Sequence, residues 1–506
     1  MKILSAQDIR SLEQQTVITQ HLSQSALMER AGRMLFGELQ NVFGECRCKA
    51  EILCGFGNNG GDGLVLGRLL HEAGHDVRVY LLDHHSYSGD NLINQERLRE
   101  SGMEISMINK DSKLNFSGGS VLLDALFGYG LSRLLDDSWA PLIEQINGAE
   151  NRVFAIDIPS GLLADQHTPA DVPVVRAERT YTIGFVKLAL LLPAYEALAG
   201  DFVLLDIGLD QDALVEIDTK NYYSTLDDVK KMVKPLDKFS HKGTFGHVVI
   251  AGGSYGSIGA VVLASRAALK SGCGLVSSYV PQCGYQIVQS NVPEALVKTD
   301  SADRVISRFA PELLKAKSVA VGMGMGTAQE SQEALHQFLK DLDKLDHPPK
   351  LLLDADALNI LSLHKEWLNL LPPYSILTPH PKELQRLLGD WETDFDKLQK
   401  ASAWSAKYQQ ILIIKGANTV IIFPDGQLHF NSTGNPGMAT AGAGDVLSGV
   451  IGSLLAQSYA PKEAAILGVF LHGLAGDCAA KTIHQKSITA SDLIEHLSDA
   501  WRYLLP

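Results

Sequence analysis

Residues 435–451, NPGMATAGAGDVLSGVI, change at Asp445 from a loop of small residues to the apolar spacing of a buried helix. The loop up to Gly444 has almost no side chains, so its amides are free to face an anion, and the helix dipole adds positive potential there. A carboxylate beside an anion costs free energy. We therefore interpret Asp445 as a base that accepts a proton from a hydroxyl while a phosphoryl group arrives. The alternative is an aspartate that only caps a core helix.

The composition indicates a globular enzyme with more than one domain. At 506 residues the chain is too long for one ordinary core, and 45% hydrophobic with 20% charged residues is typical of soluble enzymes. The net charge of −14 argues against nucleic acid or an anionic membrane as a partner. The six cysteines form no C-x-x-C pair and are expected to be reduced thiols. Polar residues directly after Met1–Leu4 predict no signal peptide, so we expect a cytoplasmic protein.

The first half alternates strand and helix patterns. This alternation predicts a doubly wound, mostly parallel sheet whose ligands lie at the carboxyl ends of the strands. The helical pattern covers residues 5–39 and 64–73, and the predicted strands cover residues 51–54, 76–82, 121–124, 153–158 and 202–207.

A glycine-rich turn follows the first of these strands. Residues 55–63, GFGNNGGDG, satisfy G-x-G-x-x-G, and Asp83 closes the second strand at the distance expected of a dinucleotide site. A redox Rossmann domain is therefore one interpretation. Asn58, Asn59 and Asp62 make the turn unusually polar, and their oxygens suit a hard cation as well. A plain glycine turn is the third interpretation.

Two further strands end in a carboxylate. Asp124 leads into ALFGYGL, and Asp157 lies in IDIPSG. One such residue is commonly a turn cap, but three carboxylate-bearing loops in one doubly wound sheet are expected to converge on one crevice.

The motifs LMERAG, GFGNNGGDG, DALFGYGL and DIPSGL resemble the N-terminal NAD(P)HX epimerase domain of the bifunctional NAD(P)H-hydrate repair enzymes, over about residues 1–210. The resemblance implies a Rossmann-like domain that binds hydrated NADH or NADPH together with K⁺. It implies that the hydrated nucleotide is contacted by Asn58, Asn59, Gly60, Gly61 and Asp62, and that its nicotinamide ring is contacted by Asp157. The phosphates would be contacted by Gly128, Tyr129, Gly130, Leu131, Ser132, Arg133 and Leu134. The implied K⁺ ligands are Asn59, Asp124 and Ser160. Tyr129 stands where the family is expected to have a smaller residue, and Arg133 and Leu134 follow a changed phosphate loop.

Inverting the C6 hydroxyl of the hydrate requires the C–O bond to be loosened and remade. One positioned acid/base can serve both directions, and Asp157 is the candidate.

The second half repeats the arrangement of buried strands followed by glycine-rich or polar turns. The turn at 252–260, GGSYGSIGA, follows a strand at 247–251 and lacks the G-K-[ST] of a P-loop, so we expect its small residues to admit a flat ring or ribose. His380 lies where a strand becomes a helix, and a structural histidine beside proline is its alternative. Lys415 ends the strand at 411–414 and is placed to hold phosphate, unless it is only a solvated strand end.

The motifs HKGTFG, DADALNIL, LTPHPKE, KGANT and NPGMATAGAGDVLSG resemble the ADP-dependent NAD(P)HX dehydratase domain, which is similar in fold to ribokinase. The resemblance covers about residues 226–506 and implies ADP as co-substrate in bacterial relatives and ATP in eukaryotic ones. It implies hydrate contacts from Ala260, Met325, His380 and Asp445, and ADP or AMP contacts from Lys415, Gly416, Ala417, Asn418, Thr419 and Gly444. Kinase chemistry implies Mg²⁺ with ADP, ordered through water by Glu383. Residues 441–444, AGAG, replace the family's usual glycine-threonine and remove a hydroxyl but not the anion-binding backbone.

We therefore predict an α/β chain with a Rossmann-like epimerase at 1–215, a linker at 216–225 and a ribokinase-like α/β/α dehydratase at 226–506. The partners expected are NADHX or NADPHX and ADP, with no nucleic acid and no membrane, and the chain is expected to form a homo-oligomer. The first unit would interconvert the R and S hydrates, and the second would dehydrate the S form with ADP, giving NAD(P)H, AMP and phosphate. The alternatives are a vitamin or sugar kinase of ribokinase type fused to a nucleotide-binding domain, a non-catalytic nucleotide sensor, and an oxidoreductase.

Overall fold

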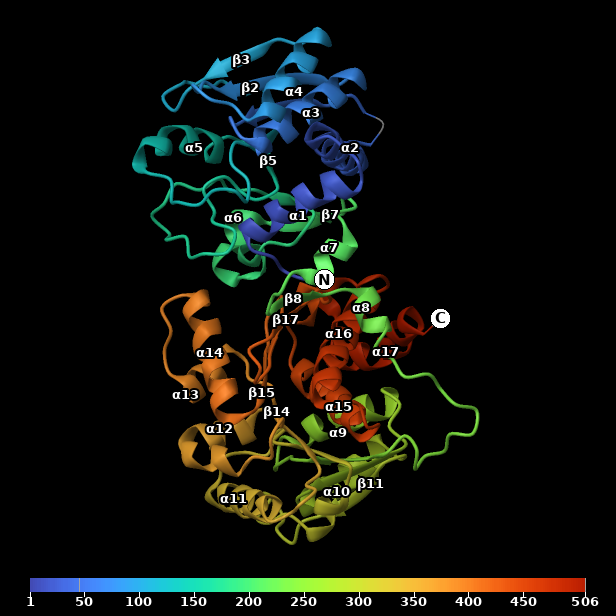
Figure 1. The fold of residues 1–506 in the computed structure, drawn as a ribbon. Coiled ribbons are helices and arrows are strands. Elements are labelled where there is room, and N and C mark those ends of the chain that lie inside the picture. Colours follow the sequence, from blue (N-terminus) through green and yellow to red (C-terminus); the bar gives the residue numbers. More distant parts are fainter. Residues whose placement is uncertain (45, 506) are drawn as a thin grey trace. The chain divides into compact units, whose positions relative to one another are not determined.

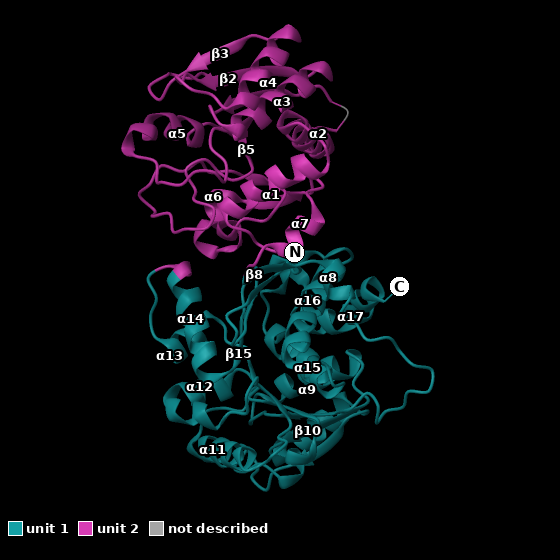
Figure 2. Cartoon of the chain, in the orientation of Figure 1, with its two compact units in different colours: residues 1, 220–392, 396–506 teal, residues 2–219, 393–395 magenta. Residues whose placement is uncertain are grey.

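The computed structural model describes residues 1–44 and 46–505 and divides into two compact units (Figure 2). The N-terminal unit consists of residues 2–219 and 393–395, and the C-terminal unit of residues 1, 220–392 and 396–506. The range predicted as a linker, 216–225, contains strand β8 (Asn221–Ser224), which pairs with a strand of the second sheet. The chain therefore passes from one unit to the other between residues 219 and 220.

The N-terminal unit is built on a parallel sheet with strand order β3-β2-β1-β4-β5-β6-β7 in the described part of the chain (Figure 1). Its strands are β1 (Lys49–Cys54), β2 (Asp76–Leu82), β3 (Ile105–Ile108), β4 (Val121–Ala125), β5 (Arg152–Ile156), β6 (Arg179–Ile183) and β7 (Asp201–Leu205). Its α-helices are α1 (Ala6–Thr19), α2 (Gln24–Phe43), α3 (Asn58–Glu72), α4 (Gly89–Glu100), α5 (Ala140–Asn147), α6 (Glu196–Ala199) and α7 (Gln211–Glu216).

Helices cover both faces of this sheet. Successive residues of a strand point to opposite sides, so neighbouring side chains pack against different helices. Ile52 of β1 belongs to a buried cluster with α2, α3 and α4, whereas its neighbour Leu53 packs in a second cluster with α5. The order of strands reverses between β1 and β4, the position at which doubly wound sheets open a crevice. The predicted Rossmann-like doubly wound fold is confirmed.

Helix α3 begins six residues earlier than predicted, at Asn58 rather than residue 64. The two asparagines and three glycines of this turn disfavour a helix by propensity. Tertiary contacts override that preference: Asn91 of α4 donates hydrogen bonds of 2.9 Å to the carbonyls of Gly55 and Gly57 and so fixes the turn that starts the helix. A Cβ at Gly60 would lie 1.9 Å from the Gly55 carbonyl oxygen, so this approach requires glycine.

The C-terminal unit contains a longer mixed sheet, with order β11-β10-β9-β12-β13-β14-β15-β16-β17-β8 among the described residues. Strands β11 to β15 are parallel, and β16 runs antiparallel to both of its neighbours. Besides β8, the strands are β9 (His247–Ala251), β10 (Leu275–Val280), β11 (Leu296–Thr299), β12 (Ser318–Val321), β13 (Lys350–Leu353), β14 (Ile376–Leu377), β15 (Ile411–Ile414), β16 (Val420–Ile422) and β17 (Leu428–Asn431).

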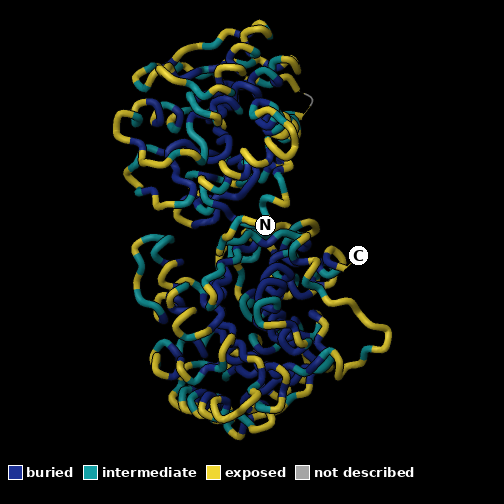
Figure 3. Tube along the Cα trace, in the orientation of Figure 1, coloured by how far each residue is buried: buried dark blue, intermediate teal, exposed yellow. Residues whose placement is uncertain are grey.

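Helices cover both faces of this sheet, which confirms the predicted α/β/α order of layers (Figure 1). They are α8 (Leu226–Lys230), α9 (Ile258–Lys270), α10 (Tyr285–Asn291), α11 (Gln329–Asp343), α12 (Asp356–Leu363), α13 (Pro381–Leu388), α14 (Asp394–Tyr408), α15 (Ala443–Ala456), α16 (Pro461–Ala480) and α17 (Ala490–Leu504). Figure 3 shows the buried strands and the helices that pack on them as the darkest parts of this unit.

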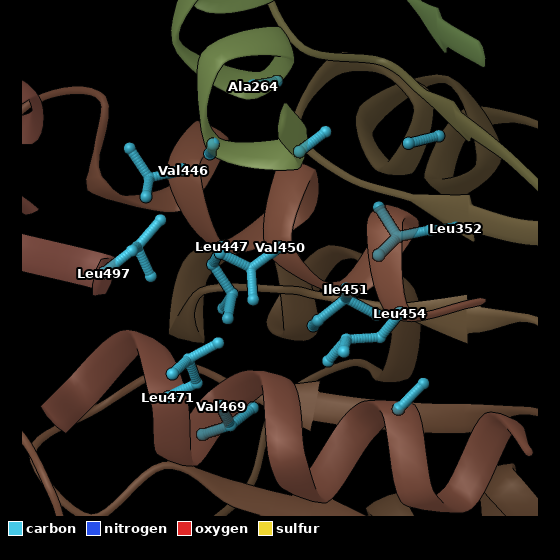
Figure 4. Packing of buried hydrophobic residues seen from close by; sticks show 14 of the residues in the cluster. Ala264, Leu352, Val446, Leu447, Val450, Ile451, Leu454, Val469, Leu471 and Leu497 are labelled. Carbon is cyan, nitrogen blue, oxygen red and sulfur yellow. The ribbon is translucent and has the colours of Figure 1, made fainter. Parts of the chain in front are cut away.

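Helix α15 is the centre of the C-terminal core (Figure 4). Every residue from Val446 to Ala456 is buried, and the helix packs against α9 and α16 and across the strands. Gly442, the residue before the helix, has φ +89°, and a Cβ there would lie 2.5 Å from Leu263. The apolar burial of the helix therefore holds the preceding loop at a fixed position.

In the described part of the chain, α16 alone is long and apolar enough to cross a membrane, with a mean hydropathy of 1.3 over its most apolar window. Of that window, 72% is buried inside the protein, where Val469 and Leu471 pack in the core around α15 (Figure 4).

Candidate functional sites

A cavity of about 1290 Å³ opens in the N-terminal unit at the carboxyl ends of β1, β4 and β5. The predicted site residues that line it are Asn58, Asn59, Asp62, Gly128, Tyr129, Gly130, Leu131, Ser132, Arg133, Leu134 and Asp157. Gly60 and Gly61 are buried behind the lining, where they pack against Gly55 and Met28. Two of the three carboxylates expected to converge, Asp62 and Asp157, reach the cavity, while Asp124 lies buried beside it.

Asp157 directly follows β5 with φ +71°, a strained conformation for a residue with a side chain. Its Oδ1 atom pairs with the ammonium of Lys187, and its Oδ2 atom accepts a 2.8 Å hydrogen bond from the backbone N–H of Tyr129. The Lys187 side chain is fully buried and also donates to the Ile183 carbonyl at 2.8 Å. The carboxylate is therefore held by the loop after β4 and paired with a buried cation.

Another carboxyl group, that of Glu13, reaches the same cavity from α1. Glu13 Oε2 accepts a 2.8 Å hydrogen bond from the Tyr129 hydroxyl, and Lys187 Nζ lies 5.5 Å from the centre of the Tyr129 ring. Burial raises the pKa of Glu13. Sequence reasoning missed both Glu13 and Lys187. The signal for Lys187 was a lone lysine in an apolar stretch, residues 185–192, because buried lysines are almost always paired.

Asp124, Ser160 and Asn59 offer oxygen atoms beside the cavity. Asp124 is fully buried and accepts hydrogen bonds from the Ser160 hydroxyl at 2.6 Å and the Ser160 N–H at 2.8 Å. Among the described residues no cationic side chain pairs with Asp124, and burial raises its pKa to about 6. Both amide atoms of Asn59 are buried without a hydrogen-bond partner. A buried carboxylate and an unpartnered amide oxygen fit a hard cation such as K⁺.

The second site lies where the loop before α15 meets the ends of β13 and β15. Lys415 Nζ donates a 2.9 Å hydrogen bond to Asp354 Oδ1, and the Ser448 hydroxyl donates a 2.6 Å hydrogen bond to Asp354 Oδ2. A Cβ at Gly444 would lie 3.5 Å from the same ammonium. Lys415 is therefore held directly over the first turn of α15, where the helix dipole already favours an anion.

Asp445 occupies that first turn. Its alternative interpretation as a helix cap is wrong, because the N-cap is Gly442 and no side chain caps this helix. The pKa of Asp445 is raised to about 7, mainly by burial and also by the neighbouring Asp354, while Lys415 opposes the shift. Such a carboxyl exchanges protons near neutral pH, which is the property required of a catalytic base.

His380 caps α13 rather than lying free. Its Nδ1 atom accepts the Lys382 N–H at 3.1 Å, while Glu383 Oε2 accepts the His380 N–H at 2.8 Å. Burial lowers the pKa of His380, and the neighbouring Lys415 lowers it as well. His380 thus has the structural role of capping α13. Its side chain is still 45% exposed, which leaves it accessible to a ligand. A contact between His380 and the hydrate stays a prediction.

The remaining predicted contacts occupy two loops. Residues 416–419 form the turn between β15 and β16, closed by a 3.0 Å hydrogen bond from the Thr419 hydroxyl to the Gly416 carbonyl. Ala260, in the first turn of α9, packs against Gly324 of the loop after β12. Met325 of that loop is fully buried, so a contact with the hydrate requires the loop to move and stays a prediction.

Comparisons with known proteins place both units in one family. Residues 24–189 match the family described as YjeF-related protein N-terminus, and residues 248–499 match NAD(P)H-hydrate dehydratase. The bifunctional NAD(P)H-hydrate repair enzyme of Moorella thermoacetica is 34% identical over 100% of this chain and 97% of its own length. The enzymes of the same description from Coxiella burnetii and Escherichia coli are 35% and 33% identical over 97% of this chain, and over 97% and 92% of their own lengths.

Solved structures align with the second half of the chain. An ADP/ATP-dependent NAD(P)H-hydrate dehydratase from Bacillus subtilis is 28% identical with a TM-score of 0.48, over 56% of this chain and 98% of that one. A ribokinase-like superfamily protein from Enterococcus faecalis is 26% identical with a TM-score of 0.49, over 57% of this chain and 99% of that one. The identity of the curated relatives extends over nearly their full length, and the resemblance predicted from the motifs is confirmed: the chain belongs to the family of bifunctional NAD(P)H-hydrate repair enzymes.

Proposed function

We propose that the chain repairs hydrated NADH and NADPH with two active sites, one in each unit. The N-terminal cavity interconverts the R and S hydrates at C6 of the nicotinamide ring, and the C-terminal site dehydrates the S form with ADP, giving NAD(P)H, AMP and phosphate. The observation that carries the proposal is the position of Asp445, a proton-exchanging carboxyl in the first turn of α15 beside the Lys415–Asp354 ion pair.

Dehydration follows from the poor leaving ability of hydroxide. Asp445 accepts the proton of the C6 hydroxyl while the terminal phosphoryl group of ADP moves to that oxygen and AMP leaves. The C6–O bond then breaks with the lone pair of the ring nitrogen assisting, phosphate leaves, and loss of a C5 proton restores the dihydronicotinamide. The amides of Gly442 and Gly444 and the ammonium of Lys415 stabilise the charge on the transferring group.

The nucleotide contacts proposed from the family are consistent with the chain's geometry. Lys415, Gly416, Ala417, Asn418, Thr419 and Gly444 lie in the turn after β15 and the loop before α15, and are proposed to hold ADP. In the described part of the chain no group of three or more acidic, histidine or cysteine side chains could hold a metal, and Glu383 is occupied in capping α13. We therefore propose that Mg²⁺ enters with the ADP phosphates, as this ion commonly does.

In the N-terminal unit, Asp157 is proposed as an acid/base residue for inversion at C6. Asn59, Asp124 and Ser160 would hold K⁺, which would neutralise the buried Asp124 carboxylate and order the cavity wall. The loop at 128–134 is proposed to contact the phosphates of the hydrate. We further propose a cytoplasmic homo-oligomer that acts on small molecules rather than on nucleic acid or membranes.

The test is to incubate the purified chain with chemically hydrated NADH and Mg-ADP and to separate the products. Recovery of NADH with release of AMP and phosphate supports the proposal. A stable phosphorylated product would instead support a ribokinase-type kinase. Asp445→Asn is expected to abolish dehydration and leave epimerisation unchanged, and Asp157→Ala is expected to do the reverse.

A further inference from the structure

Two carboxyl groups of the N-terminal cavity contact opposite ends of one residue, Tyr129. The backbone N–H of Tyr129 donates to Asp157 Oδ2 at 2.8 Å, and its hydroxyl donates to Glu13 Oε2 at 2.8 Å. Both carboxyls line the cavity, one from the end of β5 and the other from α1. Tyr129 therefore connects the two carboxyls, one through its backbone N–H and the other through its side-chain hydroxyl.

We propose that Glu13 is a second acid/base residue of the epimerase, acting on the face of the nicotinamide ring opposite Asp157. This inference rests on the proposed epimerase function of the unit. Nothing in the sequence motifs points to Glu13, and its partner Tyr129 stands where the family is expected to have a smaller residue.

Inversion at one carbon by loss and return of water requires chemistry on both faces of the ring. A group that protonates the departing hydroxyl lies on one face, and a group that activates the incoming water lies on the other. Glycosidases that invert configuration use two separated carboxyl groups in this way. The Glu13–Tyr129–Asp157 arrangement supplies a second carboxyl group, so that each face of the ring can have its own acid/base residue.

In one direction, protonated Glu13 donates its proton to the C6 hydroxyl. The C6–O bond breaks, water leaves, and the lone pair of the ring nitrogen forms a C6–N1 double bond. A water molecule then adds to C6 from the other face, the double bond returns its electrons to nitrogen, and Asp157 accepts the proton of that water. The two residues exchange roles in the reverse direction, so a round trip restores both protonation states.

The surroundings of Glu13 favour the protonated form of its carboxyl group. Its pKa is raised mainly by burial and also by Asp157, while the Tyr129 hydrogen bond lowers it. The ionisable side chains that act on Glu13 are Arg10 of α1, Asp62 of α3, Tyr129, Asp157 and Lys187. Removing the Tyr129 hydroxyl removes a donor to the carboxylate, so Tyr129→Phe must raise the Glu13 pKa.

The test uses the full chain and purified R and S hydrates of NADH, with the epimers resolved by chromatography in water enriched in ¹⁸O. Glu13→Gln is expected to lower the kcat of inversion by about 10²–10⁴-fold while KM changes by less than about threefold. Tyr129→Phe is expected to move the falling limb of the pH profile to higher pH. Glu96→Gln, an exposed residue of α4 outside the cavity, is the matched control and should behave as the wild type.

Each inversion by the wild type should place one solvent oxygen at C6. Inversion without ¹⁸O, or a Glu13→Gln variant within about twofold of the wild-type kcat, overturns the inference. A wild-type chain that does not interconvert the hydrates at all refutes the proposed function itself, and the inference with it. Epimerisation by the wild type together with full activity of Glu13→Gln overturns the role of Glu13 alone.

Discussion

Lys415 Nζ lies 2.9 Å from Asp354 Oδ1, and Ser448 occupies the other oxygen of the same carboxylate at 2.6 Å. Asp354 thus holds the ammonium at the ends of the strands, beside the amides of the loop before α15. The lysine keeps further donors for an incoming phosphate, because an ammonium has three. Because of its ion pair with Asp354, Lys415 is held within the site and is not simply a solvated residue at the end of a strand.

Lys415→Met is therefore expected to weaken ADP binding. Loss of a charged hydrogen bond to phosphate costs about 1.5–3 kcal/mol, or roughly 10–100-fold in Kd measured by calorimetry. Lys382→Met, which changes an exposed lysine of α13, is the control and should bind ADP as the wild type does. Equal affinity in the Lys415 variant would remove this residue from the nucleotide site.

Dehydration should rise with pH through about 7. The Asp445 pKa is raised to about 7, and the carboxyl must be ionised to accept the hydroxyl proton. The rate at saturating ADP and S hydrate is expected to follow one ionisation in this region, measured with the purified S epimer. A flat profile between pH 5.5 and 8.5 would show that Asp445 is not the base.

Asp445→Asn should make the folded protein more stable, although it removes the dehydratase activity. The folded-state pKa is raised above the usual value of 3.8, so the folded chain holds a proton that the unfolded chain loses, and stability falls as pH rises from about 4 to 7. The amide removes this penalty. The gain in Tm should therefore be small near pH 4, grow up to pH 7 and level off above it, as thermal unfolding at several pH values can measure.

Potassium should stabilise the N-terminal unit through Asp124. At equal ionic strength, KCl is expected to raise the unfolding temperature more than choline chloride does, by mass action on the folded state. The effect should increase above pH 6, because the Asp124 pKa is raised to about 6 and a protonated carboxyl binds a cation poorly. Asp124→Asn should lose the difference between the two salts. Asp111→Asn, an exposed residue that lines the same cavity, should keep it.

The sequence predicted the layers of both units well because apolar periodicity records burial. Strand β2 spans Asp76–Leu82, the predicted range, and the helix that follows 435–442 is buried from Val446 to Ala456, as its apolar spacing indicates. The predicted start of α3 was wrong because the hydrogen bonds of Asn91 outweigh the low helix propensity of the glycine-rich turn. Tertiary contacts of this kind leave no trace in a local pattern.

The candidate sites likewise contain residues that the sequence could predict and residues that it could not. Loops with chemistry-bearing residues at strand ends could be located by motif, and the N-terminal cavity brings most of those residues together. The residues that hydrogen-bond to these motif residues could not be located from the sequence, because they come from distant parts of the chain. Glu13 reaches Tyr129 across 116 residues, and Asp354 reaches Ser448 across 94. Such pairs are a consequence of topology and become visible only in three dimensions.

The most direct test of the account combines the purified wild-type chain, a mixture of R and S hydrated NADH, and Mg-ADP, with absorbance followed near ~340 nm, a property of the reduced cofactor. Full recovery of NADH from both epimers, with one AMP and one phosphate released for each NADH, is predicted, and Asp445→Asn should show none. ADP binding by the second unit without any recovery of NADH would contradict the account.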